Sequence, residues 1–197
     1  MRVRGRIGRA ALTAASIGAG CAPPAGLRVV SAEERGLVSR PEAIVGRDGG
    51  GSAAAFGRSV WVYGDTVLRD VDARGTNWHT NSYELRDRET WREAFEAPVD
   101  EVGAPRLLVD LTDEERAWNE AHGPEDCPEA PCHAGWALWP SEPLYDEAAG
   151  RAWLLYGLYS DAWPSGIGVA SWGGLDAPVE RRRVGGSWLL FPGPETE

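Results

Sequence analysis

Short apolar runs separated by Gly, Asp and Pro restrict the fold of this chain more than any other feature. The pattern begins at Gly46 and is the punctuation of a β-sheet. With 197 residues, 43% of them apolar, the chain is long enough for one domain with a sizeable core. We therefore expect an all-β fold. The predicted strands are Ser52–Phe56, Ser59–Tyr63, Ser82–Leu85, Ala152–Leu158, Ile167–Trp172 and Ser187–Phe191.

One segment, LTDEERAWNEAHG, carries helical signals instead. Thr112 and Glu115 have the spacing of a capping box, acidic residues fill the first turn, and Gly123 supplies a stop. The segment lies between predicted strands. We therefore expect a helical insertion at 112–122 within the β domain.

A weak internal repeat relates three of the apolar runs. GRSVWVYG at 57–64 aligns without gaps on GRAWLLYG at 150–157, and GGSWLLFP at 185–192 aligns on the latter. The intervals fit repeated four-stranded units of roughly 40 to 50 residues, as in the blades of a β-propeller. In the first alignment Asp65 falls opposite Leu158, so this position of the strand does not itself require an acid. We expect a local reason for the carboxylate.

Two acids flank the first predicted hairpin, Asp48 in VGRDGGGS and Asp65 in YGDT. The three glycines after Asp48 bring the backbone close to anything bound there. Asp65 is predicted to share a strand face with Trp61 and Tyr63, which would raise the pKa of its carboxyl by burial. A carboxylate pair is what glycoside hydrolysis requires, one as acid and the other as base or nucleophile. On spacing alone, the favoured alternatives are an Asx-turn at Asp48 and a hairpin-turn acid at Asp65.

The stretch ALWPSEPLYD presents Trp139 and then Glu142. It is interpreted either as a sugar-stacking platform with a third carboxylate or as a buried tryptophan that opens a new blade. The stretch RDVDARGTN weakly resembles a calcium loop through Asp70 and Asp72, but it lacks a third acid and the closing Glu, so we expect a solvated turn. No nucleophile elbow, phosphate loop or dinucleotide fingerprint occurs, and we expect no cofactor and no metal.

The N-terminus is typical of an export signal. Four arginines precede a short apolar stretch from Ala10 to Ala19, and GAGC then places Cys21 where bacterial lipoproteins are lipidated. We predict a signal peptide at 1–20 and a tether with lead-in at 21–45, with simple secretion as the alternative. No other apolar run is long enough to span a bilayer, so membrane association is expected only through the lipid anchor. A net charge of −10 argues against nucleic-acid partners.

The two remaining cysteines lie in the Pro-rich stretch EDCPEAPCHAG. Cys127 and Cys132 are separated by four residues, and in an exported protein such a pair most simply forms a small disulfide. The alternative adds His133 and His122 as zinc ligands. It is the weaker interpretation, because the cysteine spacing is loose and no second pair exists.

Together, the motifs GRDGGGS, VWVYGDT, GTNWHTNSYEL and ALWPSEPLYDEAAGRAWLLYG resemble a secreted five-bladed β-propeller family long catalogued as a domain of unknown function. Some relatives in that family are endo-acting hydrolases of D-arabinan. The resemblance covers Gly46 to Phe191. It implies that Asp48 and Asp65 form the carboxylate pair and that Asn81 lies near the substrate.

Five blades need on the order of 200 to 250 residues, more than this chain supplies after its tether. The resemblance therefore implies a partial β-propeller at 46–197, with about two blades, the start of a third and one inserted helix. We expect an exported protein similar to glycoside hydrolases, or a truncated remnant of one, acting on a furanose-rich polysaccharide such as arabinan. The expected substrate-binding residues are Trp61, Asn81, Trp139 and Glu142. The alternative is a non-catalytic surface lipoprotein whose aromatic side chains bind glycan or a protein partner.

Overall fold

A computed structural model describes most of the chain after residue 40. All of the described residues fall within the unit Val38–Glu197. The predicted signal peptide and Cys21 lie outside them. The described residues are 41–88, 95–123, 127–128, 130, 132, 135–160 and 166–192.

Antiparallel strands dominate these residues, which confirms the all-β class. The first sheet contains β2 (Gly51–Ala55), β3 (Arg58–Tyr63) and β6 (Ser82–Asp87), in the order β2-β3-β6. β2 and β3 form a hairpin, and the register opposes Val60 to Leu85 across β3 and β6.

A second sheet of six strands follows the helix. Four strands form the path β11-β10-β9-β7, while β8 pairs with β9 and β12 pairs with β10. All of these pairings are antiparallel. The strands are β7 (Trp136–Pro140), β8 (Leu144–Asp146), β9 (Arg151–Ser160), β10 (Gly166–Trp172), β11 (Val179–Arg182) and β12 (Phe191–Pro192).

A small sheet completes the β structure. It consists of β1 (Ile44–Arg47), β4 (Thr66–Leu68) and β5 (Trp78–His79), in the order β1-β4-β5. Ile44 and Leu68 pack with Ala104 in a separate apolar cluster. β1 begins inside the segment expected to be a lead-in, so the ordered fold starts slightly before Gly46.

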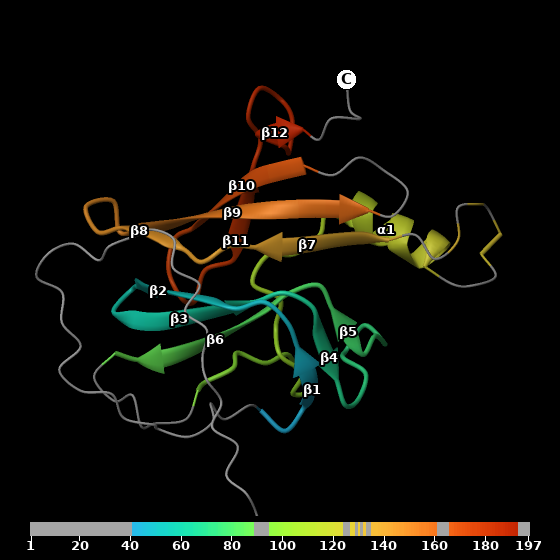
Figure 1. Ribbon diagram of the computed structural model, residues 1–197, viewed down its shortest axis with the longest axis horizontal. Helices are drawn as coiled ribbons and strands as arrows, with labels where there is room; N and C mark the ends of the chain where they lie inside the picture. The colour runs from blue at the N-terminus through green and yellow to red at the C-terminus, as the bar shows by residue number, and fades with distance from the viewer. Residues whose placement is uncertain are drawn as a thin grey trace, which may run out of the picture. The chain divides into compact units, whose positions relative to one another are not determined.

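The main core lies between the first and second sheets, which Figure 1 shows one above the other. Val60 and Val62 of β3 pack in the same cluster as apolar side chains of β7, β9 and β10. The burial of such side chains is the main stabilising contribution to a fold of this kind. The largest members from the second sheet are Leu138, Leu154, Tyr156 and Trp172.

Five of the six predicted strands are present, and the prediction of the sixth is wrong. In the segment predicted as Ser187–Phe191, only Phe191–Pro192 is a strand, and it pairs with β10 rather than opening a new sheet. Gly185 and Gly186 have positive φ angles of 59° and 89°, and Val184 and Ser187 close a tight turn around them. The chain therefore reverses where the repeat predicts a strand.

The two segments of the first repeat alignment are strands that occupy equivalent positions in their sheets. Residues 57–64 and 150–157 fall on β3 and β9, each of which follows a hairpin turn and lies inside its sheet. The buried faces do not match, however. Val60 is buried in β3, whereas its aligned partner Trp153 is exposed in β9. Because side chains alternate across a strand, the alignment is one residue out of phase with the core.

The predicted helical insertion is confirmed as α1 (Asp113–His122). Thr112 and Glu115 form both hydrogen bonds of the capping box. The Glu115 carboxylate also pairs with the guanidinium of Arg181, whose side chain is 5% exposed. Asn119 fixes α1 to β7, since its amide donates to Trp136 O and accepts from Trp136 N.

Candidate functional site

Asp65 lies at a junction between sheets and not in the middle of a strand. The chain leaves the first sheet after Tyr63 and enters β4 of the small sheet at Thr66. Two backbone hydrogen bonds tie this junction to Asp48: Asp48 N donates to Asp65 O (3.0 Å), and Gly64 N donates to Asp48 O (3.1 Å). The structure therefore brings together the two acids that the sequence pairs.

Two carboxylates of this region approach glycines closely, Asp48 at Gly64 and Glu142 at Gly51. A Cβ atom on Gly64 would lie 2.7 Å from Asp48 Oδ1, and one on Gly51 would lie 2.7 Å from Glu142 Oε2. Each carboxylate thus rests against backbone that has no side chain. Asp48 and Glu142 line a common cavity of about 370 Å³, whose floor is formed by Gly49, Gly50 and Gly51.

Trp139 joins this cavity to a larger one. Its indole Nε1 donates a hydrogen bond of 2.9 Å to Asp65 Oδ1, and its ring packs on Tyr159 with centroids 4.4 Å apart. Trp139 is 39% exposed and lines both cavities. The alternative interpretation of ALWP, a buried tryptophan, is therefore wrong.

The larger cavity, of about 830 Å³, extends from Asp65 toward the helix. Its walls come from the small sheet, the end of α1 and the second sheet. They include Trp78, His79, Arg116, Glu120, Trp139 and Tyr159. Aromatic rings beside polar groups are the usual lining of a site that binds sugars or other amphipathic ligands.

The Asp65 carboxyl is electrostatically distinct. Partial burial raises its pKa above that of a free aspartic acid, the hydrogen bond from Trp139 acts in the opposite direction, and the charge of Asp48 raises it further. The expectation that burial raises the pKa of Asp65 is met, but the predicted neighbouring side chains are wrong. The neighbouring ring belongs to Trp139, because the strand ends before Asp65 and its side chain does not continue the face of Trp61.

Trp61 lies away from both cavities. Its ring packs edge-on against Phe95, with centroids 5.4 Å apart, on the face of β3 opposite to Val60 and Val62. It lines neither cavity. The predicted substrate contact of Trp61 is therefore corrected to a packing role.

Asn81 is also not at the surface. Its side chain is fully buried, with Nδ2 donating to Val109 O (2.9 Å) and Leu138 O (3.0 Å). Oδ1 accepts from Leu108 N (2.8 Å) and Val109 N (3.2 Å). These bonds join the start of β6 to β7 and to the segment before α1. The predicted position near a substrate is wrong, because backbone groups saturate the amide.

Asp72 forms the expected turn, although it is buried and not solvated. Its carboxylate accepts hydrogen bonds from the backbone N–H groups of Arg74 and Thr76, each 2.9 Å. The second oxygen lies 2.9 Å from His79 Nε2. These hydrogen bonds within the chain occupy the Asp72 carboxylate. The turn therefore differs from the calcium loop that the sequence weakly resembles.

Because of the Asp72 turn, we expect the fold to lose stability as the pH falls. Burial acts to raise the pKa of Asp72, but the hydrogen bonds from Thr76, His79 and Arg74 outweigh it and hold the pKa below that of a free aspartic acid. The stabilisation is therefore present above the unfolded-state pKa and lost as pH falls through the folded-state value. Between about pH 5 and pH 2, the Tm of Asp72→Asn should fall less steeply than that of the wild type. Parallel slopes in thermal unfolding would contradict this.

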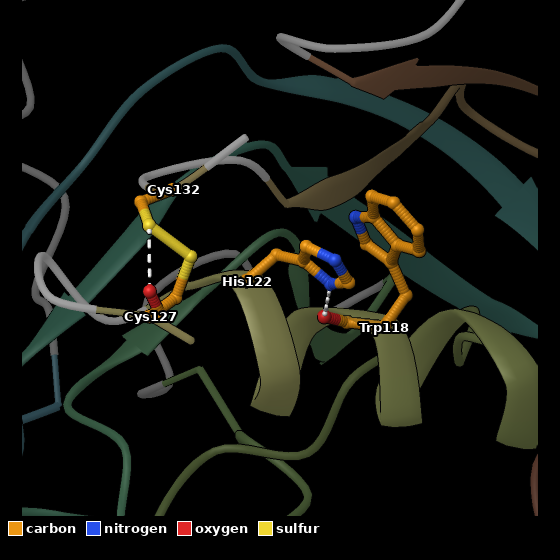
Figure 2. Close-up of a disulfide and its surroundings, with 4 residues drawn as sticks. All are labelled: Trp118, His122, Cys127 and Cys132. Carbon is orange, nitrogen blue, oxygen red and sulfur yellow. Dashed lines mark hydrogen bonds between the residues drawn. A yellow bond between two sulfur atoms is a disulfide. The ribbon is translucent and has the colours of Figure 1, made fainter. Parts of the chain in front are cut away.

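The cysteine loop resolves the choice between a disulfide and zinc. Cys127 and Cys132 form a disulfide, and Figure 2 shows it beside the end of α1. His122 directs Nδ1 to Trp118 O (3.0 Å) and stacks on the Trp118 ring. His133 lies outside the described residues. The zinc interpretation is wrong for this pair, and the described residues contain no cluster of three potential metal ligands.

A buried ion pair behind the carboxylates was not predicted. Arg47, directly before Asp48, binds Glu84 of β6 through two hydrogen bonds of 2.8 and 2.9 Å. The guanidinium lies 3.5 Å from the ring centroid of Tyr63, whose pKa is raised to about 12, mainly by burial. The cluster fixes the end of β1 against the first sheet and thereby positions Asp48. The acid within the predicted strand Ser82–Leu85 is the only sequence signal for it.

No protein-family model, curated protein or solved structure matches the chain. The assignment of function therefore rests on the geometry of this site. In the part of the chain that the structure describes, no helix is long and apolar enough to cross a membrane.

Proposed function

We propose that this chain is an exported glycoside hydrolase-like protein that acts on a furanose-rich polysaccharide such as arabinan. One observation carries the proposal: Trp139 binds the Asp65 carboxylate while it lines two cavities, one of which also contains Asp48 and Glu142. An exposed aromatic ring next to several carboxylates supplies both parts of a glycosidase site, a sugar platform and an acid–base pair.

The acid and base roles follow from the environments of the carboxyl groups. Asp65 holds its proton to higher pH than a free aspartic acid, so it is suited to protonate the leaving oxygen of a glycosidic bond. Asp48 is exposed and lines the smaller cavity, so it is suited to act as base or nucleophile. Glu142 shares the cavity with Asp48 and is a second candidate for that role.

The fold and the disulfide support two further parts of the proposal, the propeller-like architecture and export. Two antiparallel sheets packed through one core are compatible with neighbouring propeller blades. The disulfide between Cys127 and Cys132 supports export to an oxidising compartment. Lipidation at Cys21 is part of the same proposal.

A glycan-binding protein without catalysis is the second candidate. The exposure of Trp139 and its packing on Tyr159 favour it, because such a ring pair binds sugar whether or not the carboxylates react. The two functions differ in the consequence of removing the acids. A hydrolase loses product release, whereas a binding protein keeps its affinity.

Variants of Trp139 test the platform directly. Trp139→Ala should weaken binding of an arabino-oligosaccharide about tenfold in calorimetry, because the stacking surface is lost. Trp139→Phe keeps a ring but removes Nε1–H, so it should retain most of the affinity. Trp61→Phe is the matched control, since Trp61 packs on Phe95 outside both cavities. Equal affinities in wild type and Trp139→Ala would remove the platform from the proposal.

A further inference from the structure

The larger cavity contains a second exposed indole, that of Trp78 in β5. Trp78 is 41% exposed and lines the same cavity as Asp65 and Trp139. Within the described residues, its indole has neither a ring contact nor a hydrogen-bond partner for Nε1. Packing within the chain therefore does not explain why a tryptophan lies in this wall of the cavity.

The backbone that carries Trp78 is held on both sides. The Thr76 hydroxyl accepts a hydrogen bond from Trp78 N (3.2 Å) and donates one to Trp78 O (3.1 Å). Trp78 also pairs with Val67 of β4, the strand that begins directly after Asp65. Because this backbone is already ordered, little conformational freedom is lost when a ligand stacks on the indole.

The charged groups of the larger cavity favour a neutral ligand. Two arginines line it, but Arg74 donates to both carboxylate oxygens of Asp110 (3.2 and 2.9 Å), and Arg116 pairs with Asp110 and Asp113. Glu120 of α1 lines the cavity, is exposed and forms no ion pair within the described residues. Its carboxylate can accept hydrogen bonds from hydroxyl groups, whereas it would repel an anionic sugar.

The two cavities divide the carboxylates of the proposed reaction between them. Asp65 lines the larger cavity, whereas Asp48 and Glu142 line the smaller one. In the hydrolysis, the bond between the anomeric carbon and the leaving oxygen breaks and the Asp65 proton passes to that oxygen. Water supplies a hydroxyl group to the carbon and, over the cycle, a proton that restores Asp65. The sugar that departs with the oxygen is therefore expected on the side of the larger cavity.

We propose that Trp78 and Glu120 form a second sugar subsite, which takes a neutral sugar unit on the leaving side of the cleaved bond. This inference rests on the proposed function. The departing sugar stacks on the Trp78 indole and donates hydroxyl hydrogen bonds to Glu120, while the adjacent unit lies on Trp139, which lines both cavities. The preferred substrate thus carries a further neutral sugar beyond the cleaved bond, and not a small or anionic group.

Calorimetry with arabinohexaose tests the subsite without relying on catalysis. Trp78→Ala should lower the affinity about tenfold, and Glu120→Ala at least threefold. Trp78→Phe should keep most of the affinity, because it retains a ring, and its far-ultraviolet circular dichroism should match that of the wild type. The matched control is Trp153→Ala, since Trp153 is 37% exposed in β9 and lines neither cavity. Equal affinities in wild type, Trp78→Ala and Glu120→Ala would overturn the subsite and leave the proposed function standing.

Hydrolysis of arabinofuranosyl fluoride tests the side of the bond, because this substrate has no sugar on its leaving side. Trp78→Ala should lower kcat/KM for arabinohexaose about tenfold and leave that for the fluoride unchanged. An equal loss on both substrates would overturn the assignment to the leaving side. A wild-type chain that binds arabinohexaose but hydrolyses neither substrate would overturn that assignment together with the hydrolase. A wild-type chain that does not bind arabinohexaose would overturn both the subsite and the proposed function.

Discussion

Asp65→Asn is expected to reduce sugar release from arabinan by about 10² to 10⁴-fold. The amide keeps an oxygen that can accept the hydrogen bond from Trp139, so the ring should remain in place. Unlike a carboxylic acid, it has no acidic proton to give to the leaving oxygen. Affinity for an arabino-oligosaccharide should change little, because the platform is intact. Reducing-sugar assays together with calorimetry separate the two effects.

Asp48→Asn should cause a loss of similar size for a different reason. It removes the carboxylate that acts as base or nucleophile, and it also removes a charge that raises the pKa of Asp65. Any residual activity should therefore show an alkaline limb at lower pH than the wild type. The matched control is Asp70→Asn, an exposed acid that lines neither cavity. Full activity in both Asp48→Asn and Asp65→Asn would refute hydrolysis by this pair.

Asn81→Ala is expected to cause the largest loss of stability. It removes the partner of Leu108 N, Val109 N, Val109 O and Leu138 O, all in a buried region. Unsatisfied buried polar groups cost about 1 to 3 kcal/mol each, and partial relaxation reduces the total. We expect the free energy of unfolding to fall by about 3 to 5 kcal/mol, with a Tm lower by roughly 10 °C.

Asn119→Ala is the matched control, because Asn119 also uses its amide to bind backbone, at Trp136 alone and in a half-buried position. Its cost should be about 1 to 2 kcal/mol. Chemical denaturation of both variants gives the comparison. If Asn81→Ala were no less stable than Asn119→Ala and lost sugar binding instead, the structural role of Asn81 would be wrong.

Local signals explain which parts of the fold were predictable. The helix follows from Thr112 and Glu115, which interact across one turn, and the strands follow from short apolar runs. The failed strand near Ser187 also has a local cause. Its pattern of apolar residues is correct, but Gly185 and Gly186 adopt left-handed angles that reverse the chain. Composition alone does not distinguish such a turn from a bulge that continues a strand.

The site depends on contacts that the sequence does not encode locally. The pairing of Asp48 with Asp65 was predictable because both acids flank one hairpin. The partner of Asp65 was not, since Trp139 lies 74 residues further along the chain. The same holds for Asn81, whose partners Val109 and Leu138 lie 28 and 57 residues away. A polar residue beside an apolar run can either lie at the surface or bind buried backbone groups. Only the packing of β6 and β7 determines which of the two Asn81 does.

The most direct test of the central claim is a crystal structure of Asp65→Asn with a bound arabino-oligosaccharide. The proposal predicts a furanose ring over the indole of Trp139 and a glycosidic oxygen about 3 Å from the side chain of residue 65. Asp48 or Glu142 should face the adjacent anomeric carbon. A sugar bound away from Trp139, or no sugar at saturating concentration, would contradict the assignment of this site.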